Sequence, residues 1–226
     1  NGNVTATIQT STDGTNWTDY TFDTNIALAG IGDKVYFKGN YKGTGMSDYA
    51  SFVMTGKVAA SGNVMTLKDG DVPTTSLAGN DDYCFYALFS NCPSLTAAPE
   101  LPAMTLAPSC YHGMFYGCAN LTQPPSLPAT NLASNCYFYM FAFSGLTEAP
   151  ELPATTLVKE CYSDMFRGCN NLNYLKVHFT SWADEIDATL DWVGWGVPPT
   201  GTFVCPKDLD TSVRDGSHVP PGWTVE

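Results

Sequence analysis

The chain has 226 residues, of which 44% are apolar and 14% are charged, and its net charge is −12. This apolar fraction is ordinary for a folded protein and excludes a disordered chain. The acidic charge argues against nucleic acid and anionic membranes as partners, because both attract Lys and Arg, and no apolar run approaches the roughly 18–20 residues that span a bilayer.

Residues 1–75 are expected to form a β-rich N-terminal cap, either a small antiparallel sheet or a sandwich. Residues 3–10 alternate between polar and apolar positions, the turn-forming STDGTN follows, and WTDYTF comes next, which predicts a hairpin. Further strands are expected at residues 34–41, 51–58 and 63–69, between turns that contain Gly and Asn.

A tandem repeat with a period of about 26 residues occupies residues 76–178. Its copies begin at four cysteines: Cys84, Cys110, Cys136 and Cys161. These cysteines step by 26, 26 and 25 residues, and the short step reflects one residue lost near Ser144. A fixed period in this range predicts a solenoid, in which each unit packs against its neighbours.

The first half of each repeat predicts a short helix. In CYHGMFYGC, which begins at Cys110, the apolar residues fall at i, i+4, i+5 and i+8, one face of a helix. Ser109 or Asn135 can cap the start of such a helix, and Gly117 or Gly168 can end it.

The second half of each repeat must be extended, because two prolines within four residues forbid a helix. Proline also removes backbone donors, so the strand ladder here is expected to be sparse. Two sets of leucines are expected to stack inward: Leu95, Leu121, Leu146 and Leu172, and then Leu101, Leu127 and Leu152.

The cysteines of the repeats are interpreted as small buried apolar residues. Two cysteines eight residues apart on a helix are separated by roughly 12 Å, whereas a disulfide requires Cα atoms about 4.4–6.8 Å apart. Ser144 supports this interpretation, because it replaces a cysteine whose partner Cys136 remains. A disulfide ladder is the alternative. The thiols concerned are Cys84, Cys92, Cys110, Cys118, Cys136, Cys161 and Cys169.

Residues 179–226 are expected to form a C-terminal cap that is rich in tryptophan. A stack of about three and a half repeats leaves two exposed ends that make up a large fraction of its core, so both flanking regions are read as caps. The predicted fold class is therefore α+β: a short leucine-rich-repeat-like solenoid with a β-rich N-terminal cap and a Trp-rich C-terminal cap.

The repeat resembles the BspA-like, or Treponema-type, leucine-rich repeat. MFYGCANL at residues 114–121 and MFRGCNNL at residues 165–172 carry this resemblance, and the flanking DKVYFKGN and GVPPTGTFVCPKDL are similar to the flanks of a subgroup in gut anaerobes and their phages. The resemblance implies a surface-displayed or secreted interaction and adhesion protein without enzymatic activity. The proline half departs from the family pattern, because P-x-L-P stands where the family has I-x-I.

Catalytic and metal-binding signatures are absent from the sequence. The three histidines lie in unrelated contexts, and neither a nucleophile elbow nor a phosphate-binding loop is present. Asp13 in STDGTNW is interpreted as the tip of a hairpin turn, although the motif resembles a shortened Asp-box. Asp69 and Asp71 are read as a solvated loop, with a calcium site as the alternative. No metal and no cofactor are expected.

Exposed columns of the extended halves are the predicted binding surface, because stacked repeats use such columns to bind ligands. Two tryptophans of the C-terminal cap are added as aromatic candidates, with a capping core as the alternative. The candidates are Ala97, Gln123 and Glu148 in one column, Glu100, Ser126 and Glu151 in the next, and Trp192 and Trp195. Plain solvent exposure is the alternative for each column.

The sequence thus predicts a non-enzymatic, extracellular or cell-surface adhesion module that binds a host or bacterial surface protein or a glycan. A receptor-binding domain of a phage tail fibre or virion surface is the first alternative. A polysaccharide hydrolase that uses Glu100 and Glu151 is the second. The start at Asn1, without methionine or a leader, predicts a processed or trimmed protein. We expect a monomer.

Overall fold

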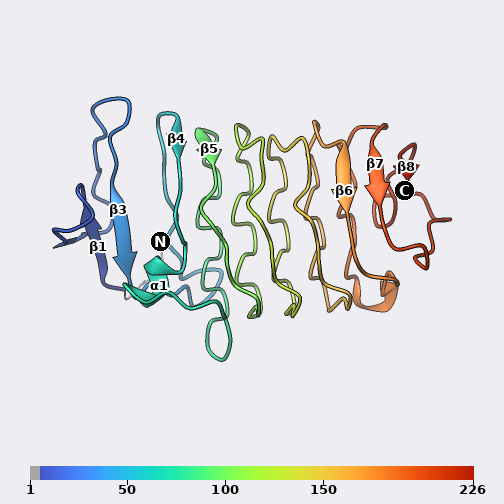
Figure 1. Cartoon of the computed structure of the whole chain (residues 1–226), viewed down its shortest axis with the longest axis horizontal. Coiled ribbons are helices and arrows are strands. Elements are labelled where there is room, and N and C mark those ends of the chain that lie inside the picture. Colours follow the sequence, from blue (N-terminus) through green and yellow to red (C-terminus); the bar gives the residue numbers. More distant parts are fainter. Residues whose placement is uncertain (1–5) are drawn as a thin grey trace.

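The computed structural model describes residues 6–226, which form an elongated row of segments. Figure 1 shows the N-terminal sheet at one end of the row, the repeated segments side by side in the middle, and the C-terminal strands at the other end. A single cluster of buried side chains runs through the row from Ile8 to Trp223. The strand predicted at residues 3–10 begins outside the described residues.

The predicted fold class, an α+β leucine-rich-repeat-like solenoid with a short helix in every repeat, is wrong. Within residues 6–226 the one α-helix is α1, Thr66–Asp69, which lies outside the repeats, and a 3-10 helix, η1, spans Asp184–Ile186. The strands are two to four residues long and belong to three small sheets. The described chain is therefore strand-rich and has almost no helix.

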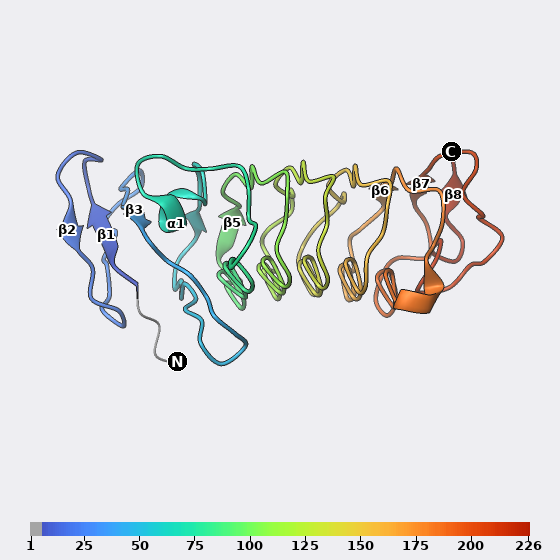
Figure 2. The same cartoon turned by 90° about the horizontal axis from the view of Figure 1, so that it is seen from below.

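Consecutive tight turns replace the predicted helices, and we call them the turn segments: residues 84–92, 110–118, 136–144 and 161–169. In residues 110–118 the N–H groups of Tyr111, Gly113 and Phe115 donate to carbonyls of the next turn segment at 2.8–3.0 Å. The N–H groups between them donate three residues back along the chain, whereas an α-helix bonds four residues back. Figure 2 shows these tightly wound stretches along one edge of the row.

Left-handed backbone at every fourth residue explains why the turn segments are not helices. Ser109, Gly113 and Gly117 have φ of +54°, +59° and +71°. Glycine adopts this conformation freely, and Asn and Asp tolerate it better than other residues. Asn135 and Gly168 also have positive φ. The prediction that Ser109 and Asn135 cap helices and that Gly117 and Gly168 end them is therefore wrong.

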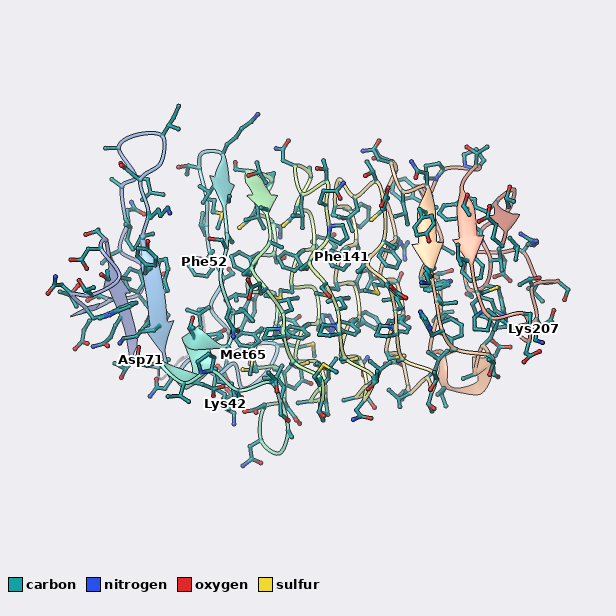
Figure 3. The ribbon with its side chains drawn as sticks, in the orientation of Figure 1. Lys42, Phe52, Met65, Asp71, Phe141 and Lys207 are labelled. Carbon is teal, nitrogen blue, oxygen red and sulfur yellow. The ribbon has the colours of Figure 1, made fainter. Side chains whose placement is uncertain are left out.

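Two columns of aromatic rings fill the interior behind the turn segments. The rings of Phe89, Phe115, Phe141 and Phe166 stack with centroids 5.6–6.0 Å apart and planes within 7° of parallel. The rings of Tyr111, Tyr137 and Tyr162 stack in the same way at 5.8–5.9 Å. Figure 3 shows Phe52 and Phe141 between the two edges of the row. Aromatic residues at equivalent positions of successive repeats therefore stack on one another.

All eight cysteines are free, and the seven of the repeats are buried. The prediction that these seven thiols pack as small apolar residues is confirmed. Burial raises the pKa of the Cys118 thiol to about 12, so the thiol stays protonated at neutral pH and is a poor nucleophile. Ser144 occupies the place of a cysteine, and its Oγ lies 3.5 Å from the Sγ of Cys169.

The proline halves are extended, and their ladder is sparse, as predicted. Few backbone bridges join neighbouring copies, for example those from Thr105 to Asn131 and from Leu152 to Val177. The leucines expected to point inward are all buried. Side-chain packing therefore holds this edge of the row together more than hydrogen bonding does.

The N-terminal region contains an antiparallel sheet of β1 (Ile8–Ser11), β2 (Thr18–Asp19) and β3 (Tyr36–Gly39) in the order β2-β1-β3. The predicted hairpin is confirmed as β1 and β2. Residues 63–69, predicted to be a strand, instead contain α1, in which Leu67 is buried. Most of the strand predicted at residues 51–58 is missing, because regular pairing begins at β4 (Val58–Ala59), which runs parallel to β5 (Leu95–Ala97).

The C-terminal region continues the row with β6 (Tyr174–Lys176), β7 (Thr202–Val204) and β8 (Thr224–Val225), which pair in parallel in this order. Leu175 and Phe203 are fully buried on adjacent strands. The final pairing, of β7 with β8, lies at the C-terminal end of the row in Figure 1.

Candidate functional site

The outward face of the turn segments carries an unusual concentration of aromatic side chains. Inward positions are occupied by Tyr111, Met114 and Phe115, whereas His112 and Tyr116 are only half-buried and lie on the outward face. These outward residues border an open hollow of about 450 Å³, which we call the aromatic hollow. Its lining consists of Tyr49, Tyr86, Ala87, Ser90, His112, Gly113, Tyr116, Tyr139, Phe143 and Arg167.

One wall of the aromatic hollow is formed by Tyr49, Tyr86 and His112, which belong to a column of ring contacts that continues to Phe138. The Tyr86 ring lies 4.8 Å from His112, and His112 lies 4.8 Å from Phe138, in each case between ring centroids. Tyr49, from the N-terminal region, extends this column with an edge contact to Tyr86 at 4.9 Å. Because these rings occupy the same position in successive turn segments, the hydrogen bonding between repeats sets their spacing.

The second wall contains rings that are turned relative to one another. Tyr116 meets Phe143 at 5.4 Å and 69°, and Phe143 meets Trp195 at 6.0 Å and 52°. Trp195 is 69% exposed. The Phe143 ring lies directly over Gly168, where a Cβ atom would collide with it. Glycine at position 168 therefore lets this wall reach across to the following repeat.

The floor between the two walls consists of small residues. Ala87 and Gly113 occupy equivalent places in two turn segments, both with positive φ, and no atom lies within 4 Å of the position that a Cβ of Gly113 would take. The next turn segment places Tyr139 there, and its ring contacts both Phe138 and Tyr116. Tyr139 therefore closes one end of the hollow, which exists because Gly113 has no side chain.

The lining of the aromatic hollow contains one charged side chain, Arg167, which lies beside Tyr139 and is paired with Asp164 behind the lining. Arg167 Nη1 lies 3.0 Å from Asp164 Oδ1. Asp164 holds the pKa of the Arg167 guanidinium above its ordinary value. Burial raises the pKa of the Asp164 carboxyl, and the hydrogen bond from Arg167 opposes this rise. The Arg167 guanidinium is therefore already paired with the Asp164 carboxylate in the free protein.

His112 sits in the stacked wall as a neutral imidazole. Burial lowers its pKa to about 4, whereas an unperturbed histidine has a pKa of about 6.5. The unfolded chain takes up a proton between these two pH values and the folded protein does not. The stability that depends on this neutral imidazole is therefore complete above about pH 6.5 and is lost as the pH falls toward about 4.

Replacing His112 by phenylalanine is expected to make the stability less dependent on pH. The next repeat already has Phe138 in this position, so the ring stack survives. Between neutral pH and about pH 5, the free energy of unfolding of the wild-type protein should fall by about 2 kcal/mol more than that of the variant. Urea unfolding at both pH values measures this difference. An equal loss in both proteins would contradict a neutral, half-buried His112.

The six candidates of the extended halves lie on the surface, where plain exposure explains them. All six are exposed: Ala97, Glu100, Gln123, Ser126, Glu148 and Glu151. Two of them are brought together, because Glu100 and Ser126 border a shallow hollow in which half of the lining residues are prolines. Gln123 Nε2 donates a weak hydrogen bond to the Thr147 hydroxyl at 3.4 Å. None of the six lines the aromatic hollow.

Glu151 is a poor general acid for glycoside hydrolysis. Lys176 Nζ lies 2.8 Å from its Oε1, and His178 contacts the same oxygen. Lys176 first and His178 second hold the pKa of the Glu151 carboxyl below its ordinary value. A catalytic acid needs a raised pKa, so this geometry does not favour the hydrolase alternative.

The two tryptophan candidates have different environments. Trp192 is completely buried, and its Nε1 donates to the carbonyl of His218 at 2.9 Å, so it packs the core and cannot meet a ligand. Trp223 is also buried and donates to Pro198. Trp195 is exposed and touches Phe143 at the edge of the aromatic hollow. Of the predicted site residues, Trp195 alone lies beside the candidate site.

The acidic groups of both segments are held by the protein's own groups, and Asp69 is the half-buried last residue of α1, so its prediction as part of a solvated loop is wrong. The Asp13 carboxylate accepts hydrogen bonds from the backbone N–H groups of Thr15 and Asn16, which makes it the tip of the β1–β2 turn. Asp69 contacts Lys68, and Asp71 contacts Lys38 at 2.8 Å. Within residues 6–226, no group of three or more His, Cys, Asp or Glu side chains is placed to hold a metal ion.

Comparison with known proteins adds no information about the site. The chain matches no protein-family model, no curated protein and no solved structure. The resemblance to BspA-like surface proteins therefore stays a prediction. In the part of the chain that the structure describes, no helix has the length and apolar character needed to traverse a bilayer.

Proposed function

We propose that this chain is a non-enzymatic binding module, secreted or displayed on a cell surface, that binds a glycan in the aromatic hollow. The single observation that carries the proposal is the bare floor at Gly113 between two aromatic walls. Ligand sites are typically concave, lined by aromatic side chains, and equipped with a few polar groups. This hollow supplies four phenols, an imidazole, a serine hydroxyl and a guanidinium.

A glycan suits this lining better than a flat protein surface does. The C–H groups of a sugar ring carry partial positive charge and pack well against the electron-rich faces of aromatic rings. The phenol groups of Tyr86, Tyr116 and Tyr139 provide both hydrogen-bond donors and acceptors for sugar hydroxyls. Because the rings come from consecutive repeats roughly 5 Å apart, the site suits an extended chain of sugars.

Filling the floor of the aromatic hollow tests the proposal. Gly113→Tyr places in the second turn segment the ring that the third already carries as Tyr139. Gly62→Tyr is the matched control, because Gly62 also has positive φ and open surroundings and does not line the hollow. Binding of both variants and of the wild type is measured on a glycan array and then by calorimetric titration.

The wild type and Gly62→Tyr should bind the same glycan with similar affinity, and Gly113→Tyr should bind it at least about tenfold more weakly. Equal thermal unfolding of the two variants shows that both are folded. Two results would overturn the proposal: no glycan bound by the wild type, or undiminished binding by folded Gly113→Tyr.

A further inference from the structure

We infer that the ligand of the aromatic hollow is an uncharged glycan, whose hydroxyl groups meet the Arg167–Asp164 pair at the end closed by Tyr139. This inference rests on the proposed function and specifies the chemical class of its ligand. It depends on three features: the pairing of Arg167, the charge of the surrounding protein, and the orientation of the rings.

The pairing of Arg167 removes the one cationic side chain of the lining as a receptor for an acidic sugar. Its guanidinium is 3.0 Å from the Asp164 carboxylate, and Asp164 is buried while Arg167 is partly exposed. His112 is half-buried, and this burial lowers its pKa to about 4, so the imidazole is neutral at physiological pH. An acidic sugar that used the remaining N–H groups of Arg167 would bring a second carboxylate close to the buried carboxylate of Asp164, and like charges at that distance repel.

Sugar hydroxyls fit the same ion pair without displacing either partner. A hydroxyl can donate to a carboxylate oxygen and accept from a guanidinium N–H at the same time. Hydrogen bonds to charged groups are stronger than those between neutral groups. The Arg167–Asp164 pair can therefore fix the orientation of a neutral ligand and make its binding specific. Tyr139 lies beside the pair, and its pKa is raised by burial and then by the charge of Asp164. Its phenol therefore remains a protonated donor.

The negative charge of the whole chain also disfavours an acidic ligand. The net charge is −12, so anionic glycans and nucleic acids are repelled at long range. Proteins that stack bases on aromatic rings also need a positively charged groove for the phosphates. The described lining of the hollow offers one guanidinium, and that group is already paired.

The orientation of the rings determines where a sugar can pack. In the column of Tyr86, His112 and Phe138 each ring lies against the next, so the column presents ring edges to the hollow. Tyr139 and Phe143 are turned by about 70° to Tyr116. An apolar sugar face therefore packs at the end near Tyr139, which is also the end where the Arg167–Asp164 pair can meet the hydroxyls.

The experiment compares neutral and acidic oligosaccharides of similar length, with single-stranded oligo(dT) as a third probe. Calorimetric titrations of the wild type are performed at about 50 mM and about 500 mM salt, because ionic contacts weaken as salt rises. Neutral oligosaccharides should bind with less than about a twofold change in Kd between these conditions. Acidic oligosaccharides and oligo(dT) should bind at least about tenfold more weakly than the best neutral ligand.

Asp164→Asn tests the role of the Arg167–Asp164 pair, because it removes the carboxylate partner of Arg167. Its effect must be distinguished from that of the changed net charge. It should weaken binding of the neutral ligand and strengthen binding of acidic oligosaccharides. Asp208→Asn makes the same change in net charge at an exposed site away from the hollow and should alter neither. Unchanged binding of both ligand classes by folded Asp164→Asn would overturn the role of the pair.

A wild-type protein that prefers acidic glycans or oligo(dT), with binding that weakens at high salt, would overturn the inference. If Gly113→Tyr still blocked a preferred acidic glycan, the proposed function would stand and the inference alone would fail. If no glycan bound at all, both would fail.

Discussion

Replacing Phe115 by alanine is expected to lower the free energy of unfolding by about 3–5 kcal/mol. Phe115 is completely buried and lies in a stack, with Phe89 and Phe141 each 5.6 Å away between ring centroids. Its removal leaves a cavity in the middle of the row and interrupts the stack, so the rings of Phe89 and Phe141 each lose the ring that lies between them. Chemical denaturation monitored by tryptophan fluorescence measures the change.

Two control variants define what the Phe115→Ala result means. Phe115→Leu keeps most of the side-chain volume, so its free energy of unfolding should be lower than that of the wild type by about 1.5 kcal/mol or less. This smaller loss measures the contribution of the ring stack apart from that of the cavity. Met104→Ala alters an exposed side chain in the preceding repeat and should change stability by less than about 0.5 kcal/mol. A loss for Phe115→Ala no larger than for Met104→Ala would contradict the stacked core.

Replacing Gly145 by alanine is expected to lower the free energy of unfolding by more than about 2 kcal/mol. A Cβ at this position would collide with the carbonyl oxygen of Ala119 and lie 3.1 Å from its carbonyl carbon. Both atoms belong to the backbone of the preceding repeat, so no side chain can rotate away. The Gly145 N–H also donates to the Cys118 carbonyl at 3.3 Å, and this bond would be strained.

Gly56→Ala is the matched control for Gly145→Ala. No atom lies within 4 Å of the position that the alanine methyl group would take at residue 56, and the φ of Gly56 is not in the left-handed region. The stability of this variant should stay within about 1 kcal/mol of the wild type and can rise, because alanine restricts the unfolded chain. Equal thermal unfolding of the two variants would show that the repeats are not in close contact at Gly145.

The sequence pattern predicted the buried face of the repeats and not their backbone. Cys110, Met114, Phe115 and Cys118 are buried, as the apolar spacing required. The same spacing suits a helix, and it suits a series of turns whose every fourth residue is left-handed. Gly113 and Gly117, four residues apart, were the signal for turns, because a helix gains nothing from two glycines on its outer face.

The candidate site was missed because its geometry follows from the turns. A helical interpretation treats His112, Gly113 and Tyr116 as ordinary solvent-facing residues. With alternate N–H groups bonded to the next repeat, the same residues align with Tyr86 and Tyr139 and enclose a hollow. Trp195 was found as a candidate from its residue type alone, and its neighbour Phe143, fifty-two positions earlier in the chain, could be placed beside it only by the fold.

The acceptor of the hydrogen bond made by the Phe115 N–H distinguishes the turn segments from helices. Nuclear magnetic resonance can detect scalar coupling across a hydrogen bond in protein labelled with nitrogen-15 and carbon-13. The turn segments predict a coupling from the Phe115 nitrogen to the carbonyl carbon of Met140, whose oxygen lies 2.9 Å away in the next repeat. A coupling to the carbonyl of Tyr111, four residues back, would show a helix and contradict the turn segments and the aromatic hollow built on them.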